Sequence, residues 1–233
     1  NNKSLIMLLT LTSIQDSPPI QTEKTLSLLE LIQNGGLGGQ LIIGLLFVLS
    51  LVVVYIYFER LFAIRAAVKV NPNFMSQIRI FVSGGKIDSA QQLCLSENLP
   101  VARLVSKGIS RIGRPLEDIN TAIENAGRLE VYKLEKNVSV LATIAGAAPM
   151  LGFLGTVIGM ILSIFEISNA GGNIDMQLLA NGLYTAMTTT VAGLIVGIIA
   201  YITYNHLVVK TSKAVYQMES TSLEFLDLLN EPA

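Results

Sequence analysis

Three long runs without a charged residue, at 31–58, 137–165 and 176–205, constrain how this 233-residue chain can fold. A helix that crosses the hydrocarbon region of a membrane needs about 20 mostly apolar residues, and each run is long enough. The apolar residues are continuous rather than alternating, which excludes the strands of a membrane β-barrel. We therefore predict three transmembrane helices, at residues 37–58, 138–165 and 178–205.

The overall composition agrees with a membrane protein and disfavours an enzyme. Charged residues make up 14% of the chain, whereas soluble domains carry about 25%. The net charge of −1 gives no indication of a nucleic-acid partner. Cys94 and His206 are the only residues of their types, so neither a disulfide nor a histidine-based metal or triad site is expected. An intramembrane hydrolase built on Ser163 would lack a base in the plane of that serine.

The distribution of positive charge predicts the orientation of the three helices. The segment 59–137 holds twelve of the sixteen Lys and Arg residues, and 166–177 holds none. Because Lys and Arg accumulate on the cytoplasmic side, we expect 59–137 and the tail 206–233 to be cytoplasmic. The N-terminus and the loop 166–177 are then periplasmic.

The remaining segments are expected to be helical or interfacial. Residues 1–17 are either a signal-like segment or a piece that lies along the membrane surface. Residues 18–36 predict a short amphipathic helix on the periplasmic side. In 59–137, apolar stripes separated by Gly and Pro predict a small helical domain, whose last helix should continue into the second span without a break. The third span should run on as a helix through 206–233. The predicted fold is thus an all-α membrane protein with long cytoplasmic helical extensions.

Small residues recur at helical spacing along one face of the second span and one face of the third. The residues that form these close-packing faces are Ala145, Pro149, Gly152, Gly159, Gly182, Ala186, Gly193 and Gly197. Hydroxyl groups accompany them at Thr156, Ser163, Thr185 and Thr190. One interpretation is that the two helices pack tightly, with hydroxyls bonded to the helix backbone. The other is that the faces line a narrow, mildly polar pore that these four hydroxyl residues help to form.

An absence of ionisable groups limits how such a pore could work. Ion-carrying membrane proteins usually place an ionisable residue in the pathway, yet the three predicted spans contain none. If protons cross here, a partner protein must supply the titrating group.

Two motifs resemble those of the MotA/TolQ/ExbB proton-channel family, and of ExbB and TolQ in particular. They are APMLGFLGTV at 148–157 and GLYTAMTTTVAGL at 182–194, supported by Glu59-Arg60 and Gly35-Gly36. The resemblance extends from about Leu26 to the end of the chain.

The resemblance implies a homopentameric ring in the inner membrane of a Gram-negative bacterium. The ring would surround single-span helices of an ExbD- or TolR-like partner, each bearing an aspartate. Proton passage would then drive work on a TonB- or TolA-like protein, with no cofactor and H⁺ as the transported ion. Thr156 and Thr190 match the pore positions of the family, and Thr185 stands where many relatives carry glutamate. The resemblance leaves open ExbB or TolQ identity, the outer-membrane task, and a ring that only holds a partner without conducting.

Overall fold

The computed structural model describes residues 37–69, 71–169 and 176–230, and over these ranges the chain is helical without strands. The helices are α3 (Leu37–Val68), α4 (Phe74–Ser83), α5 (Ile87–Glu97), α6 (Pro100–Ile109), α7 (Leu116–Glu135), α8 (Val138–Asn169) and α9 (Met176–Asn230). The all-α prediction is confirmed. The expected segments at 1–17 and 18–36 lie outside the described residues.

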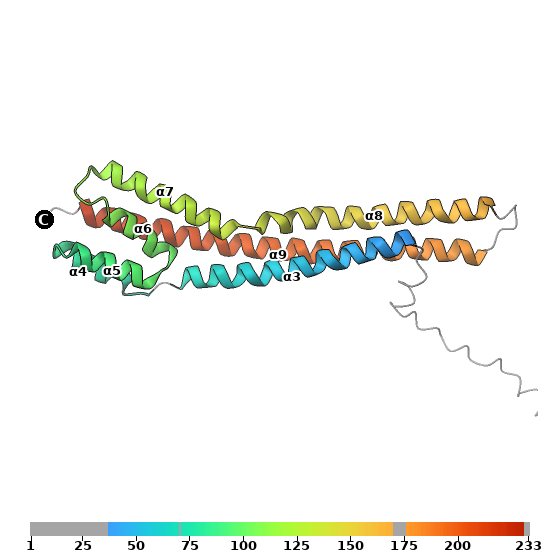
Figure 1. Cartoon of the computed structure of the whole chain (residues 1–233), viewed down its shortest axis with the longest axis horizontal. Coiled ribbons are helices and arrows are strands. Elements are labelled where there is room, and N and C mark those ends of the chain that lie inside the picture. The colour runs from blue at the N-terminus through green and yellow to red at the C-terminus, as the bar shows by residue number, and fades with distance from the viewer. Residues whose placement is uncertain (1–36, 70, 170–175, 231–233) are drawn as a thin grey trace, which may run out of the picture.

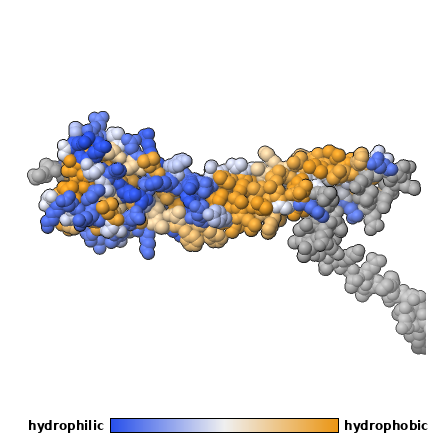
Figure 2. Space-filling model, viewed as in Figure 1, coloured by the Kyte–Doolittle hydropathy of each residue, from blue (hydrophilic) through white to orange (hydrophobic). Residues whose placement is uncertain are grey.

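Three long helices lie side by side and form the elongated body of the molecule (Figure 1). These helices, α3, α8 and α9, are the parts that are long and apolar enough to cross a membrane, as predicted. Apolar residues cover the end of the molecule built from them, and polar residues gather at the α4–α7 end (Figure 2). The chain is therefore a multi-pass membrane protein.

Two of these helices extend well beyond the predicted spans. Helix α3 continues ten residues past position 58 to Val68. Helix α9 runs without interruption to Asn230 over 55 residues, which confirms that the third span continues as a helix through the tail. Around this extension pack α6 and α7, with Phe225 of α9 completely buried between them, against Gly108 and Ile123.

The expected continuous helix from the small domain into the second span is wrong. Helix α7 ends at Glu135, Asn137 has a left-handed backbone with φ +63°, and α8 begins at Val138. In a continuous helix the carbonyl of Lys133 would accept the N–H of Asn137. The guanidinium of Arg60 donates to that carbonyl instead, at 3.0 Å. A side chain of α3 thus caps the end of α7, and asparagine tolerates the left-handed backbone that follows.

A buried carboxylate connects α7 to α6 close to this break. Glu130 is almost fully buried and accepts hydrogen bonds from Arg103 at 2.6 Å and from Lys133 at 2.7 Å. Burial by itself raises the pKa of Glu130, but the two hydrogen bonds and the two positive charges outweigh it and hold that pKa below its usual value. The ionised form is therefore the one that stabilises the fold.

The most extensive contact in the fold joins α8 to α9, along a line that we call the seam. Seam contacts pair Gly182 with Ser163, Gly159 with Ala186, Gly155 with Thr189, Gly152 with Gly193, and Gly197 with Pro149. The pairing advances along α9 as it retreats along α8, so the two helices are antiparallel. A Cβ added to Gly152 would lie 2.8 Å from the carbonyl oxygen of Thr189 and 3.1 Å from the Cα of Gly193. The obstructing atoms are backbone, so no side chain can move aside to relieve the contact.

Acid titration tests the role of Glu130. Its folded-state pKa lies below the unfolded value of about 4.3, so its stabilisation is complete above that pH and is lost as the pH falls through the folded value. We expect Glu130→Gln to lower the Tm at pH 7 by roughly 2–4 °C for each kcal/mol lost, and the difference from wild type to shrink as the pH falls below 4. Thermal unfolding of both proteins in one detergent measures this. The exposed Asp227→Asn serves as the control, and a Tm difference that stays constant from pH 7 to pH 3 would contradict the assignment.

The seam predicts opposite outcomes for two glycines of the same helix. Gly152→Ala should lower stability by about 1–3 kcal/mol, because the added methyl forces the two backbones apart. Gly146 has open space around its Cβ position, so Gly146→Ala should be neutral or slightly stabilising through helix propensity. Apparent Tm values in the same detergent compare the two variants. Equal changes in Tm would show that backbone approach at Gly152 does not limit packing.

Candidate functional site

The middle of the seam holds two threonines of α9 directed at one carbonyl of α8. The Thr190 hydroxyl donates to the Gly152 carbonyl across the seam at 3.1 Å. Thr189 approaches the same oxygen at 3.4 Å while it donates to Ala186 of its own helix at 2.7 Å. Glycine at 152 leaves its carbonyl uncovered by a side chain and allows α9 to come within hydrogen-bonding distance.

Ser163 lies further along the same seam. It is buried, it donates to the Gly159 carbonyl at 2.8 Å, and its side chain meets α9 at Gly182. A Cβ at Gly182 would overlap the serine hydroxyl, so this contact requires glycine. The structure therefore brings Ser163 and Thr190 onto one interhelical surface, as the helical spacing predicts.

The other two predicted residues have different surroundings. Thr156 is half-buried and donates to the Phe153 carbonyl of its own helix at 2.6 Å. The seam position beside it is taken by Gly155, which packs against Thr189. Thr156 therefore lies near the edge of the contact between α8 and α9 within one chain.

Thr185 packs towards α3 rather than into the seam. It is buried, it donates to the Asn181 carbonyl at 3.0 Å, and its methyl group lies against Gly39 of α3. A Cβ at Gly39 would come within 2.7 Å of that methyl carbon. At the position where many relatives carry glutamate, this chain thus has a small side chain between two helices.

The eight predicted small residues lie along the seam, from Ala145 near one end to Gly182 near the other. Within one chain these contacts are tight helix packing. The pore interpretation concerns several chains together and stays a prediction for Thr156, Ser163, Thr185 and Thr190.

Thr189 is a seam residue that the sequence reasoning did not select. It is completely buried, and its side chain fills the space over Gly155. The available signal was its spacing, since it follows Ala186 by three residues and precedes Gly193 by four. That spacing fits the small face as well as the spacing of Thr190 does.

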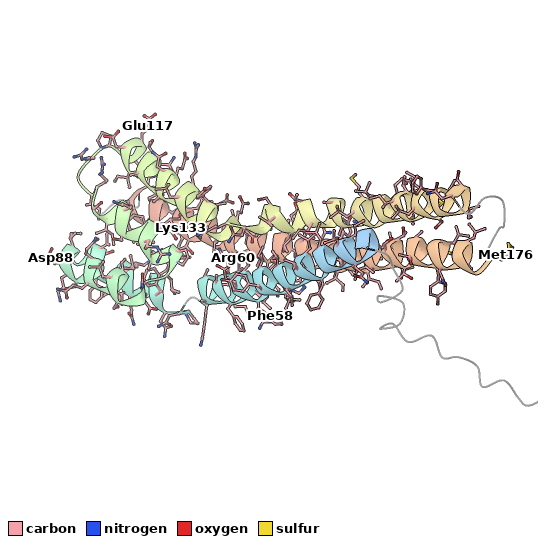
Figure 3. All side chains as sticks on the ribbon, turned by 45° about the vertical axis from the view of Figure 1, so that its right-hand side comes forward. Phe58, Arg60, Asp88, Glu117, Lys133 and Met176 are labelled. Atoms are coloured by element: carbon pink, nitrogen blue, oxygen red, sulfur yellow. The ribbon has the colours of Figure 1, made fainter. Side chains whose placement is uncertain are left out.

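The electrostatic character of the site is neutral and weakly polar. The hydroxyls of Thr156, Ser163, Thr185 and Thr190 all donate to backbone carbonyls, which leaves their oxygen lone pairs free to accept. Figure 3 shows Arg60 and Lys133 near the end of α8 that lies away from Met176. Among the described residues, no group of three or more His, Cys, Asp or Glu side chains could hold a metal ion.

Comparison with known proteins covers this part of the chain. Residues 96–220 match the model of the MotA/TolQ/ExbB proton channel family, a region that includes α6 to α8 and most of α9. A putative biopolymer transport protein ExbB homolog of Methanothermobacter thermautotrophicus is 31% identical over 53% of this chain and 43% of its own length. Biopolymer transport protein ExbB of Aquifex aeolicus is 35% identical over 47% of this chain and 74% of its own length.

A third relative is a TolQ protein rather than an ExbB protein. Tol-Pal system protein TolQ of Haemophilus influenzae is 30% identical over 48% of this chain and 49% of its own length. The chain spans about half the length of the first curated relatives it matches. The seam and its hydroxyl residues lie within the matched region. The chain belongs to the MotA/TolQ/ExbB proton channel family and resembles ExbB and TolQ proteins within it.

Proposed function

We propose that this protein is the channel-forming subunit of an inner-membrane complex that converts the proton motive force into mechanical work. Its partner would be an ExbD- or TolR-like single-span protein, and the work would act on a TonB- or TolA-like protein for outer-membrane transport or envelope maintenance. The observation that carries the proposal is the charge-free seam with Thr190 at its centre, inside the region that matches the proton-channel family.

The chemistry of the hydroxyls indicates which form of a partner's carboxyl they would favour. A hydroxyl that donates to a backbone carbonyl can still accept a hydrogen bond, so it suits the O–H of a protonated acid. An ionised carboxylate would need donors, and in an apolar setting its charge is costly. The surface that bears these hydroxyls would therefore raise the pKa of the partner's aspartate and favour the neutral, protonated form of that side chain. Thr190 would accept from that acid.

A conducting path needs more than one copy of the chain. Within one chain the seam is closed, because the backbones of α8 and α9 touch at Gly152 and Gly193. Large apolar side chains such as Phe153 and Leu194 remain exposed beside it, and neighbouring copies could cover them. We propose a homopentameric ring with the N-terminus periplasmic and the C-terminus cytoplasmic, in which Thr156 at the edge of the seam comes to face the partner.

The alternative is a ring that holds its partner and conducts nothing. The same small-residue contacts favour it, since glycine faces and back-bonded hydroxyls are sufficient to join helices in a membrane. The two proposals differ in whether protons cross the assembled complex.

A measurement of proton flux distinguishes the conducting ring from the non-conducting one. Proteoliposomes that contain this protein and its single-span partner should take up protons under an imposed potential, reported by a pH-sensitive dye inside the vesicles. Thr190→Val preserves the shape of the side chain and removes the hydroxyl. With about 0.5–1.5 kcal/mol for one hydrogen bond, the flux should fall roughly two- to twelvefold.

The control is Thr203→Val, a threonine of α9 that bonds to Ile199 of its own helix outside the seam, and its flux should match wild type. Wild-type flux in Thr190→Val would leave that threonine with a packing role only. An assembled complex with no flux at all would support the non-conducting ring.

A further inference from the structure

One face of α3 points away from the other helices along the whole length of the membrane span. Its exposed apolar residues recur at helical spacing, namely Leu41, Phe47, Leu51, Tyr55, Phe58 and Phe62. Figure 3 shows Phe58 on the outer side of α3, with Arg60 turned towards the other helices. Ile64 and Ala67 continue the buried side of the helix beyond the span. The exposed stripe is thus a single, continuous surface.

This stripe ends in an aromatic pair followed by two positive charges. Phe58 and Phe62 are 50% and 63% exposed, and their rings stack with centroids 6.4 Å apart. Arg65 follows Phe62 by three residues, so Phe58, Phe62 and Arg65 share one helical face. Lys69 comes directly after the end of α3 at Val68. Arg65 and Lys69 are exposed, and within the described residues neither has a hydrogen bond or an ion pair.

The positions of these residues along the helix match the layers of a bilayer. From Leu37 to Phe58, the limits of the predicted span, the helix rises about 31 Å at 1.5 Å per residue, close to the hydrocarbon thickness of about 30 Å. Phe62 and Arg65 then lie about 6 Å and about 10 Å beyond the hydrocarbon boundary, and the Arg65 side chain is long enough to reach back to the phosphate groups. Lys69, just past the end of α3, lies further out and adds a second positive charge near the membrane surface.

The positive charge near the end of α3 favours anionic over zwitterionic lipids. Glu59 is the one acidic residue in 37–69, and its carboxylate forms an ion pair with Arg60. No other acidic residue in 37–69 is therefore available to neutralise Arg65 and Lys69, which follow the stacked rings of Phe58 and Phe62. We propose that Phe58, Phe62, Arg65 and Lys69 form a binding site for an anionic phospholipid of the adjacent leaflet. The acyl chains would lie along the apolar stripe, and the phosphate would contact Arg65, with Lys69 adding positive charge at the membrane surface.

The chain offers a direct probe because it contains no tryptophan. A Phe62→Trp variant places the only indole at the site, and Phe47→Trp places it on the same stripe about 22 Å away. Each variant is reconstituted into mixed phosphatidylglycerol and phosphatidylcholine vesicles, with one of the two lipids brominated at a time. The two quenching curves give the relative binding constant of the anionic over the zwitterionic lipid at each position.

We expect a ratio on the order of fivefold at Phe62→Trp, from two basic groups near a screened membrane surface, and a ratio near one at Phe47→Trp. Adding Arg65→Gln and Lys69→Gln to Phe62→Trp should return the ratio to near one. The matched pair Arg111→Gln and Arg114→Gln, which are exposed residues of the small helical domain, should leave it unchanged.

Three results would overturn the site. A ratio near one at Phe62→Trp shows no preference for the anionic lipid, and an equal preference at both positions shows a general charge effect without a site. Absence of quenching by either lipid at Phe62→Trp shows that protein covers this face.

Discussion

The close approach of the α8 and α9 backbones at Gly152 and Gly193 is the contact on which the rest of the structure depends. It holds two membrane helices near enough for Thr190 to bond to a carbonyl of the other helix. In a membrane there is no hydrophobic driving force between helices, so contacts of this kind and interhelical hydrogen bonds supply the attraction. The seam is therefore both the main packing surface and the location of Thr190, one of the two threonines that match pore positions in the family resemblance.

A second junction, at the end of the apolar body, determines where the small helical domain lies. Arg60 donates a hydrogen bond to the carbonyl of Lys133. About one turn earlier in α7, Glu130 accepts hydrogen bonds from Arg103 and Lys133. These contacts join α3, α6 and α7 where α7 gives way to α8. The guanidinium of Arg60 satisfies the carbonyl that loses its intrahelical partner at this helix break.

Much of the architecture could be predicted from the sequence because hydropathy and length act locally. The three spans and the continuation of α9 through the tail follow from long apolar runs and uninterrupted helical spacing. The break at Asn137 could not be predicted in this way, since the group that caps the end of α7 is Arg60, which is 73 residues from Lys133 in sequence. In the candidate site, too, local spacing predicts some features, and tertiary packing determines the others. Helical spacing placed Gly152 and Ser163 on one face of α8 and Thr190 on one face of α9. It could not tell Thr156 from Gly155 or direct Thr185 towards Gly39, because those outcomes depend on the exact rotation of α8 against α9 and on where α3 packs.

In the assembly that we propose, the hydroxyls of this protein hold a partner's carboxyl in its protonated form. The protonation state of that carboxyl in the assembled complex is the most direct test. Infrared difference spectroscopy with an isotope-labelled aspartate on the partner would report the carbonyl stretch of the neutral acid as the pH is varied. The account predicts that the band persists to near neutral pH, well above the ordinary value of about 3.9 for aspartate, and that it shifts when Thr190 is replaced by valine. A carboxyl that is fully ionised above pH 5, with a spectrum indifferent to Thr190, would contradict the account.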